Sequence, residues 1–476
     1  MVFRDIRQFI EALDEKGELV RIKQEVDWDL EVGAISRRAY ETEAPAILFE
    51  NIKDYPQDYR IHSGSLGTYR RLAIAMGLDP DTPIRLISEE YERREQQRVK
   101  PITVDSGPCK ENIITGAEID LHRFPAPMIH EGDGGRYIAT WHLVVSRDPD
   151  EGWTNWGMYR FMIHDSKYLA GFPQPLTHLA MVLRDKYLPA GKPMPVAIVI
   201  GAEPLTTLAA SATPRIKDEE VEYAGALRQQ PVELVKCESN DLLVPAHAEI
   251  VIEGEILPDS TAPEGPFGEY SGYRGGGIRL RPLCQVTAIT HRTSPILTMS
   301  NMGILDECST AWALSQSLAV KRRLKSHGIP VKDVFMHPWT TTFMVVVGVE
   351  SGGRKIAEQI GQILTARRAA ISKIVVVDRD VDVFHPGQVA HALATKCHPG
   401  RGIVIIEYEG KANPITPCYS AEERKKLKGA TAVFDCTWPK EWSIEYDIPT
   451  KSCFTDIYPQ KLQEKVLRNW TNYGFK

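Results

Sequence analysis

The segment from Pro263 to Arg274, Pro-Glu-Gly-Pro-Phe-Gly-Glu-Tyr-Ser-Gly-Tyr-Arg, constrains the backbone more than any other stretch of this chain. Pro266 has no backbone N–H and holds the residue before it in an extended conformation, which disfavours a regular helix. Gly265, Gly268 and Gly272 admit backbone angles that other residues avoid. The sequence therefore predicts a rigid series of turns.

Two carboxylates, Glu264 and Glu269, lie five residues apart in this segment. An ordinary core does not require two acids on one rigid turn. If the turn brings them together, one acid can keep its proton near neutral pH and serve as a proton donor. The alternative is a surface loop, rich in Gly and Pro, that carries two solvated acids.

The composition excludes several classes of protein. At 476 residues the chain is too long for one small core, and we expect about two to four domains. Hydrophobic residues make up 43% and charged residues 25%, as in ordinary globular proteins. Because the formal net charge is −6, no global basic field favours nucleic acid, and the basic runs at 321–325 and 424–428 are interpreted as solvated faces.

No signal for a membrane or for secretion is recognisable. No apolar run approaches the roughly 20 residues of a membrane span, and the N-terminus lacks a signal-peptide core. The eight cysteines form no Cys-x-x-Cys pair, which argues against a zinc ribbon, an iron–sulfur site or a disulfide framework. We expect a cytoplasmic protein with no membrane partner and with reduced, mostly buried cysteines such as Cys284 and Cys436.

The pattern of apolar residues changes once along the first three hundred residues. Residues 1–105 are expected to form an α/β domain, with a helix over 3–16, a strand at 19–22 and a charged boundary at 89–100. Residues 106–308 are rich in strand and turn signals and predict a β-rich, barrel-like domain. In that domain we expect a helix at 176–187 and strands at 196–200, 231–236, 249–255, 282–290 and 296–299.

Residues 309–440 alternate helical and extended patterns, which predicts an α/β layer with parallel strands. Helices are expected at 310–326, 355–370 and 387–396, and strands at 343–349, 373–377 and 403–408. The tail, 441–476, carries a helix near 461–470 with Leu462, Val466, Leu467 and Trp470 as an apolar stripe. Such a stripe needs a partner, and one option is a second subunit, so we expect a homo-oligomer, a dimer or larger.

A second candidate site lies at 153–160, Trp-Thr-Asn-Trp-Gly-Met-Tyr-Arg. Asn155 and Arg160 are polar among aromatic residues, and Arg160 can clamp a carboxylate through a two-pronged contact. His178 and Glu220 follow in the sequence. An Asn, a His and a Glu together make a mixed oxygen and nitrogen site suited to Mn²⁺ or Mg²⁺. Taken singly, His178 also fits a structural histidine.

Several stretches in this order resemble the UbiD family of decarboxylases, which use prenylated FMN. They are Thr-Asn-Trp-x-x-x-Arg at 154–160, Glu-Tyr-Ala-Gly-Ala-Leu at 222–227, Val-Lys-Cys-Glu-Ser-Asn-Asp-Leu-Leu-Val-Pro-Ala at 235–246, Pro-Glu-Gly-Pro-Phe-Gly-Glu at 263–269, Asp-Val-Asp-Val-Phe at 380–384, and Ala-Thr-Lys-Cys at 394–397. The resemblance runs nearly end to end. The final Tyr-Pro-Gln-Lys-Leu and Asn-Trp-Thr-Asn-Tyr-Gly-Phe especially resemble the ferulic/cinnamic acid decarboxylase branch.

The resemblance implies a mixed α+β fold with a central split-barrel, flavin-binding domain between the N-terminal and C-terminal α/β domains. It implies that Asn155, His178 and Glu220 bind Mn²⁺, which bridges the protein and the cofactor phosphate. A K⁺ ion is expected beside it, with Trp156 and Glu220 as contributors. The implied cofactor contacts are Asn155, Trp156, Met158, Tyr159, Arg160, Thr177, His178, Glu220 and Leu314.

The resemblance also assigns the chemistry. Arg160, Glu264 and Glu269 are implied to form the catalytic network over the flavin ring, with Glu269 as the proton donor. One position departs from the family pattern. Many relatives carry a cofactor-contacting lysine where this chain has Thr431, and Lys428 is the substitute that we consider.

The implied reaction is the reversible, non-oxidative decarboxylation of an α,β-unsaturated or (hetero)aromatic carboxylic acid through a covalent adduct with prenylated FMN. Loss of CO₂ from an sp² carbon needs an electron sink that no unmodified side chain supplies. The expected partners are therefore the acid, CO₂ and a prenyl-FMN synthase that supplies the cofactor. By position in the family pattern, the pocket candidates are Thr177, Tyr270, Leu314 and Phe454.

Three alternatives remain open. The chain could be an aryl carboxylase or decarboxylase subunit for a larger aromatic or thioester substrate. It could also be a flavin-binding split-barrel protein without decarboxylase activity, although flavin binding requires neither Glu264 nor Glu269. A catalytically silent assembly subunit is the third alternative, and the presence of Arg160 and of all three candidate metal ligands argues against it.

Overall fold

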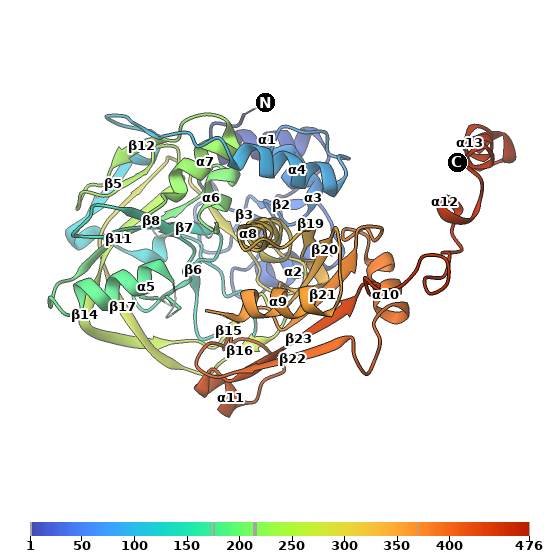
Figure 1. The fold of residues 1–476 in the computed structure, drawn as a ribbon. Helices are drawn as coiled ribbons and strands as arrows, with labels where there is room; N and C mark the ends of the chain where they lie inside the picture. The colour runs from blue at the N-terminus through green and yellow to red at the C-terminus, as the bar shows by residue number, and fades with distance from the viewer. Residues whose placement is uncertain (1, 172, 175–176, 213–216, 368, 476) are drawn as a thin grey trace.

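The N-terminal part of the chain is built on a four-stranded sheet with the order β1-β2-β3-β18 (Figure 1). The computed structural model describes residues 2–171, 173–174, 177–212, 217–367 and 369–475. The strands are β1 Leu19–Ile22, β2 Ala46–Phe49, β3 Arg60–Ser63 and β18 Ile296–Met299. The strands predicted at 19–22 and 296–299 are confirmed. However, β18 pairs in parallel with β3, rather than with the strands of the central part.

One of the helices beside this sheet covers part of the stretch 89–100, which the sequence predicted to be a domain boundary. The helices are α1 Ile6–Glu15, α2 Glu31–Glu41, α3 Tyr69–Ala75 and α4 Ile84–Glu95. Residues 89–95 of the boundary predicted at 89–100 form the end of α4. Ile87 and Tyr91 bury one face of this helix, and the buried Arg94 donates to the backbone oxygens of Met76 and Leu227, at 2.7 and 2.9 Å. These contacts explain why a stretch rich in charge is helical here.

The central part is a nine-stranded sheet. Its strands are β5 Asn112–Thr115, β6 Tyr137–Ala139, β7 His142–Arg147, β8 Thr154–Gly157, β9 Phe161–Ile163, β10 Tyr168–Gly171, β11 Met194–Ile200, β14 Ile250–Glu264 and β17 Arg279–His291. The order is β6-β9-β10-β17-β14-β11-β7-β8, and β5 pairs with β17. Among the described residues the two end strands do not pair with each other, so the barrel-like sheet does not close.

Shorter elements surround the central sheet. They are β4 Ile102–Thr103, β12 Glu233–Lys236 and β13 Leu243–Pro245 in a small sheet, with α5 His178–Val182, the π-helix η4 Leu183–Tyr187, α6 Pro204–Ala209 and α7 Glu220–Arg228. The helix predicted at 176–187 is confirmed from residue 178 onward, in two helical forms, and residue 176 lies outside the described residues.

The C-terminal part is a five-stranded sheet in the order β19-β20-β21-β23-β22. Its strands are β19 Val331–Phe335, β20 Met344–Val349, β21 Lys373–Asp378, β22 Ile403–Tyr408 and β23 Gly429–Cys436, and its helices are α8 Ala313–Ser326, α9 Arg354–Thr365, α10 Pro386–Thr395 and α11 Ala421–Lys426. The prediction of parallel strands holds for β20, β21 and β23. It is wrong for β22, because the chain turns back at Leu427, with φ of 50°, and β23 returns antiparallel to β22. Residue 368, within the helix predicted at 355–370, lies outside the described residues.

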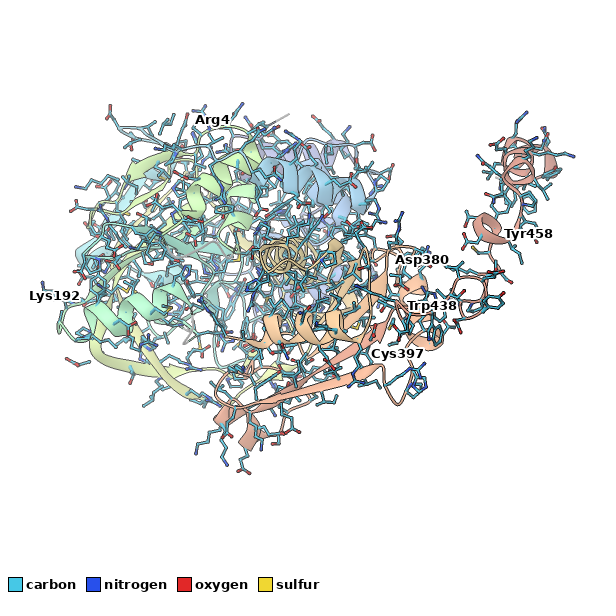
Figure 2. All side chains as sticks on the ribbon, viewed as in Figure 1. Arg4, Lys192, Asp380, Cys397, Trp438 and Tyr458 are labelled. Atoms are coloured by element: carbon cyan, nitrogen blue, oxygen red, sulfur yellow. The ribbon has the colours of Figure 1, made fainter. Side chains whose placement is uncertain are left out.

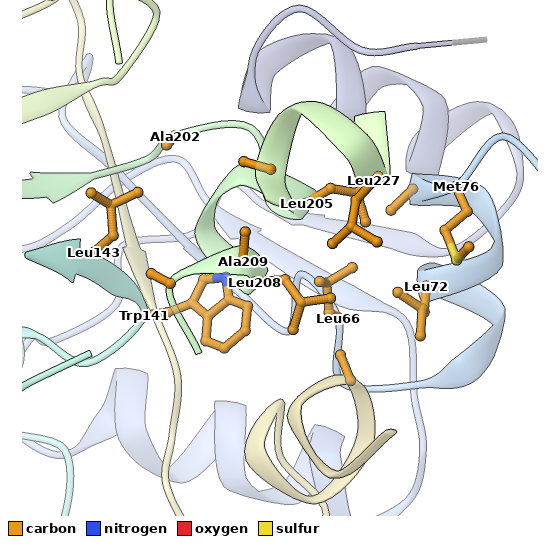
Figure 3. Packing of buried hydrophobic residues seen from close by; sticks show 14 of the residues in the cluster. Leu66, Leu72, Met76, Trp141, Leu143, Ala202, Leu205, Leu208, Ala209 and Leu227 are labelled. Atoms are coloured by element: carbon orange, nitrogen blue, oxygen red, sulfur yellow. The ribbon is translucent and has the colours of Figure 1, made fainter. Parts of the chain in front are cut away.

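One hydrophobic core joins the N-terminal and central parts. Leu66 and Leu72 pack in the same cluster as Leu205 and Leu208 of α6 and Leu227 of α7 (Figure 3). This core fixes the central sheet against the N-terminal helices. The positions of the domain boundaries stay a prediction.

The tail leaves the body of the molecule as an arm (Figures 1 and 2). It carries α12 Phe454–Ile457 and α13 Gln460–Arg468, and none of the residues 438–475 is buried. Leu462, Leu467 and Trp470 are 42%, 63% and 42% exposed. The apolar stripe predicted for the last helix is therefore not buried by the part of the chain that the structure describes. None of the helices in the described ranges has the length and apolarity to cross a membrane.

Candidate active site

The acid segment forms a buried turn at the end of β14. The strand ends at Glu264, Gly265 adopts a φ of 85°, and the chain continues into β15 (Phe267–Gly268). Glycine adopts such a positive φ without steric cost, as the sequence predicts. Glu264 and Glu269 are only 1% and 8% exposed. This burial excludes the alternative of a solvated surface loop.

The turn rests on the loop that precedes β6. A Cβ at Gly268 would lie 2.4 Å from the ring of His130, and a Cβ at Gly134 would lie 2.1 Å from the backbone oxygen of Gly265. Asp133 accepts a hydrogen bond of 2.9 Å from the backbone N–H of Gly268. Glycine is therefore required at both contact points, and a side-chain carboxylate fixes the end of the turn.

Arg160, between β8 and β9, joins the two acids. Its Nε and Nη2 lie 2.8 and 3.2 Å from the two oxygens of Glu264, and its Nη1 contacts Oε1 of Glu269. The Tyr137 hydroxyl donates to Glu264 Oε1 at 2.7 Å, and the guanidinium lies 4.8 Å from the centre of the Phe267 ring. The structure thus brings together all three residues predicted to be catalytic, in a two-pronged arrangement for Glu264.

The two acids differ in their surroundings. Burial raises the pKa of Glu269 above its ordinary value, Arg160 opposes that rise, and the charges of Glu264 and Asp133 add to it. Burial lowers the pKa of Arg160, but the two carboxylates more than offset this and raise it overall. Arg160 therefore stays charged, and Glu269 is the acid of this network that burial drives toward its protonated form.

The three candidate metal ligands lie on neighbouring elements. Asn155 is on β8, while His178 and Glu220 begin α5 and α7, both of which pack against β8. The backbone N–H of Trp156 donates to Glu220 Oε2 at 2.9 Å. The ring of Trp153 lies 5.3 Å from that of His178. The same strand therefore contacts the residues that begin both helices.

Tyr159 connects this cluster. Burial raises its pKa to about 12, while contacts of its hydroxyl with the side chains of Asn155 and Thr177 lower it and the nearby charge of Glu220 raises it. A Cβ at Gly157 would lie 2.3 Å from the same hydroxyl, so only glycine fits beneath it. Asn155, Thr177 and Glu220, three of the predicted cofactor contacts, thus lie near one buried hydroxyl.

The chemistry of these donors fits a divalent cation. Glu220 is 2% exposed, and burial raises its pKa to about 8, so a positive charge beside it would relieve the cost of ionising it. Burial lowers the pKa of His178, which favours the neutral imidazole that binds metals. Within the described residues, no group of three or more His, Cys, Asp or Glu forms a metal site. The amide of Asn155 would therefore have to serve as the third ligand.

The structure separates the remaining pocket candidates. The Tyr270 ring lies 5.2 Å from that of Trp312 and 6.0 Å from that of Phe343, and Leu314 follows Trp312 on α8. These residues lie together beside the acid turn. Phe454 lies on α12 of the arm, and its own chain does not bring it to the turn (Figure 1).

Thr431 is part of the C-terminal sheet. Its buried hydroxyl donates to the backbone oxygen of Ile371 at 2.8 Å and lies 3.0 Å from the Tyr408 hydroxyl. Lys428 is exposed at the start of β23. Threonine at this position thus has internal hydrogen-bond partners, and it does not reproduce the charge of a lysine.

Sequence reasoning missed several polar neighbours of the acids. They are Tyr137, Asp133, Arg281, whose Nε lies 3.6 Å from Glu264 Oε2, and Asn413, whose amide donates to the Tyr270 hydroxyl at 3.3 Å. All come from elements distant in the sequence. The alternation of Arg279 and Arg281 with apolar or proline residues was a weak signal for one face of a strand.

Comparisons with known proteins identify relatives along nearly the whole chain. Family models described as the N-terminal, Rift-related and C-terminal domains of 3-octaprenyl-4-hydroxybenzoate carboxy-lyase match residues 10–91, 100–304 and 309–436. Pyrrole-2-carboxylic acid decarboxylase from Pseudomonas aeruginosa is 34% identical, with 99% of this chain and 98% of that protein covered. Ferulic acid decarboxylase 1 from Saccharomyces cerevisiae is 32% identical, with the same coverage.

A solved structure shares the whole architecture. It is an evolved dimeric form of the UbiD-class enzyme HmfF from Pelotomaculum thermopropionicum in complex with prFMN, with a TM-score of 0.79 and 31% identity over 93% of this chain and 96% of that chain. The resemblance inferred from the sequence motifs is confirmed, as is the mixed α+β fold class. Because all three family models match in order and relatives above 30% identity align almost end to end, the chain belongs to the UbiD family of carboxy-lyases.

Proposed function

We propose that this chain catalyses the reversible, non-oxidative decarboxylation of an α,β-unsaturated or (hetero)aromatic carboxylic acid with prenylated FMN. The observation that carries the proposal is the buried guanidinium of Arg160 bound to both Glu264 and Glu269. Bound prenylated FMN supplies the electron sink that the side chains lack. The protein then has to hold the acid substrate, exclude water and move one proton.

The acid network performs the proton transfer. Glu269 has the pKa that burial raises, so it carries the proton to the carbon that loses CO₂. Glu264 binds Arg160 through both of its oxygens, accepts from the Tyr137 hydroxyl, and so keeps the guanidinium in place. Arg160, fixed between the two acids, also attracts the carboxylate of the substrate.

The cluster of Asn155, His178 and Glu220 would hold the cofactor phosphate through a metal ion. Asn155, His178 and Glu220 supply the oxygen and nitrogen donors that Mn²⁺ accepts, and Trp156 and Glu220 supply oxygens for K⁺. The cation would offset the phosphate charge in a buried site. Met158, Tyr159, Thr177 and Leu314 are proposed to line the cofactor.

A substitution in this cluster should remove metal and flavin together. Replacing Glu220 or His178 with Ala is expected to lower the Mn²⁺ content and the retention of the flavin to the same extent, because one ion ties the two. The measurement is elemental analysis with flavin absorbance after gel filtration. Glu219→Ala is the matched control, since the Glu219 carboxylate accepts from Thr154 N–H on the same strand at 3.1 Å. If both contents persist in Glu220→Ala and in His178→Ala, the metal assignment is refuted.

The surroundings of the acid turn favour a planar aromatic substrate. Tyr270, Trp312 and Phe343 present rings on that side, and relatives of this chain are named for decarboxylation of pyrrole-2-carboxylic and ferulic acids. The test is a panel of arylacrylic, benzoic and five-membered heteroaromatic acids offered to cofactor-loaded enzyme, with CO₂ release and the reverse carboxylation both followed. No turnover of any member in either direction would refute the proposal. Turnover confined to larger aromatic acids or thioesters would favour the aryl carboxylase alternative.

We also propose that the arm makes the protein a homo-oligomer, at least a dimer. The arm exposes Leu462, Leu467 and Trp470, and none of its described residues is buried, so a second copy is the cover that we propose. Removing residues 457–476 is expected to reduce the assembly to monomers by light scattering at micromolar concentration. Leu467→Asp should weaken association, and Lys461→Asp on the same helix should leave it intact. A monomeric mass for the unaltered protein would contradict the proposal.

A further inference from the structure

Arg281 lies beside the acid pair on the ribbon formed by β14 and β17. The register places Glu264 opposite Arg279 and Ala262 opposite Arg281. Residues two apart on a strand share a face, so both arginines lie on the face that carries Glu264. Nε of Arg281 is 3.6 Å from Glu264 Oε2, and its side chain is 23% exposed. Its charge therefore acts on the carboxylate through less water than a fully exposed arginine would.

Positive charge is distributed unequally over the two acids. Glu264 has Arg160 at 2.8 and 3.2 Å, the Tyr137 hydroxyl at 2.7 Å, and Arg281 on its other side. Glu269 contacts a single nitrogen of the Arg160 guanidinium, and the negative charge of Asp133 acts on Glu269. Two cations thus face one carboxylate, and one cation and one anion face the other.

Charged and titratable groups from every neighbouring element face this pair. They are Tyr137 on β6, His130 and Asp133 on the loop before it, Arg160 between β8 and β9, Arg279 and Arg281 on β17, and the Cys308 thiol near Glu269. In this set, Arg281 is the cation that approaches Glu264 without also contacting Glu269 in any described hydrogen bond or ion pair.

We infer that Arg281 is a positioning residue of the decarboxylase site, whose guanidinium keeps Glu264 ionised and so directs the proton shared by the acid pair to Glu269. The inference rests on the proposed function, since it requires Glu269 to be the proton donor. Arg160 alone already contacts Glu264 through two nitrogens and Glu269 through one. Arg281 adds to the preference for ionised Glu264, because an opposite charge within about 4–6 Å favours the charged form of a carboxyl group.

Three variants of the cofactor-loaded enzyme test this role. Arg281→Gln removes the charge, Arg281→Lys keeps it, and Lys192→Gln removes an exposed cation just before β11, outside the group that faces the acid pair. Turnover is followed from pH 5 to 10 for each variant. Flavin absorbance, Mn²⁺ content and the melting temperature show whether each variant is folded and loaded.

The charge-removing variant should change both the height and the position of the pH profile. Without Arg281 the proton divides between the acids, and equal sharing would lower the plateau of turnover about twofold. Removing a cation also destabilises the ionised pair, so the basic limb of the profile should move upward by about one pH unit. Arg281→Lys should return the basic limb to its original pH, and Lys192→Gln should match the unaltered enzyme.

Two results would overturn the inference. One is a fall in turnover without movement of the basic limb, which is what a purely structural residue would give. The other is a rise in KM alone, which would make Arg281 a substrate-binding residue. A refuted role for Arg281 is separated from a refuted function by the exchange of the product's vinylic or aryl hydrogen with D₂O, measured in Glu269→Gln. If exchange is lost in Glu269→Gln while the Arg281→Gln limb stays fixed, only the role of Arg281 is refuted.

Discussion

Glu269→Gln should reduce turnover by about 10²–10⁴-fold, which is the range that a positioned proton donor contributes. The substitution keeps the size of the side chain and its ability to hydrogen bond, but removes the acid. The measurement is turnover of cofactor-loaded enzyme on an acid that it accepts, together with exchange of the product's vinylic or aryl hydrogen in D₂O. That exchange runs the protonation step in reverse, so it should disappear as turnover does.

Glu264→Gln is the matched variant on the same turn. It should also lower turnover, because it disturbs Arg160, which binds Glu264 through two nitrogens. The residual hydrogen exchange should be greater than in Glu269→Gln, because the donor is still present. Both variants should retain flavin and metal, since neither acid belongs to the cluster of Asn155, His178 and Glu220. Normal exchange in Glu269→Gln would show that another group moves the proton.

Protein produced without a prenyl-FMN synthase should have almost no activity. The reason is chemical: breaking the bond between CO₂ and an sp² carbon leaves an electron pair that no side chain of the acid network can accept. The measurement compares protein from a strain that lacks the synthase with protein from a strain that co-expresses it. Mass spectrometry of the extracted flavin identifies what each preparation carries.

The control for this comparison is the folded state. Both preparations should share a circular dichroism spectrum and an oligomer mass, so that the difference lies in the cofactor alone. Adding the prenylated cofactor to the inactive preparation should restore turnover in part. Full activity from a strain without the synthase would refute the dependence on prenylated FMN.

Much of the secondary structure could be predicted from the sequence. The patterns of apolar residues predicted strands β1 and β22 residue for residue, and helix α1 with a start three residues too early. The same patterns carry no information on pairing. For that reason β18 could not be placed beside β3, and the antiparallel direction of β22 was missed, because both depend on the path of the chain between strands.

The candidate site also contains some residues that could be predicted from the sequence and others that could not. Glu264, Glu269 and Arg160 were predicted because their motifs contain rare combinations of Gly, Pro and charge, and the resemblance supplied their roles. Arg281 was missed because its position beside Glu264 depends on the β14–β17 register, which no local pattern encodes. Asn413 was missed because its neighbour Tyr270 lies 143 residues away in the chain.

The membership of β18 in the N-terminal sheet affects the order of folding during synthesis. Strands β1, β2 and β3 lie within the first 63 residues, but the strand that pairs with β3 ends at Met299. The sheet therefore remains one strand short, with an exposed edge, while more than two hundred further residues are made. Pairing over such a sequence separation is slow, and an open strand edge can pair with other chains. The ribosome must release the whole central part before the first sheet is complete.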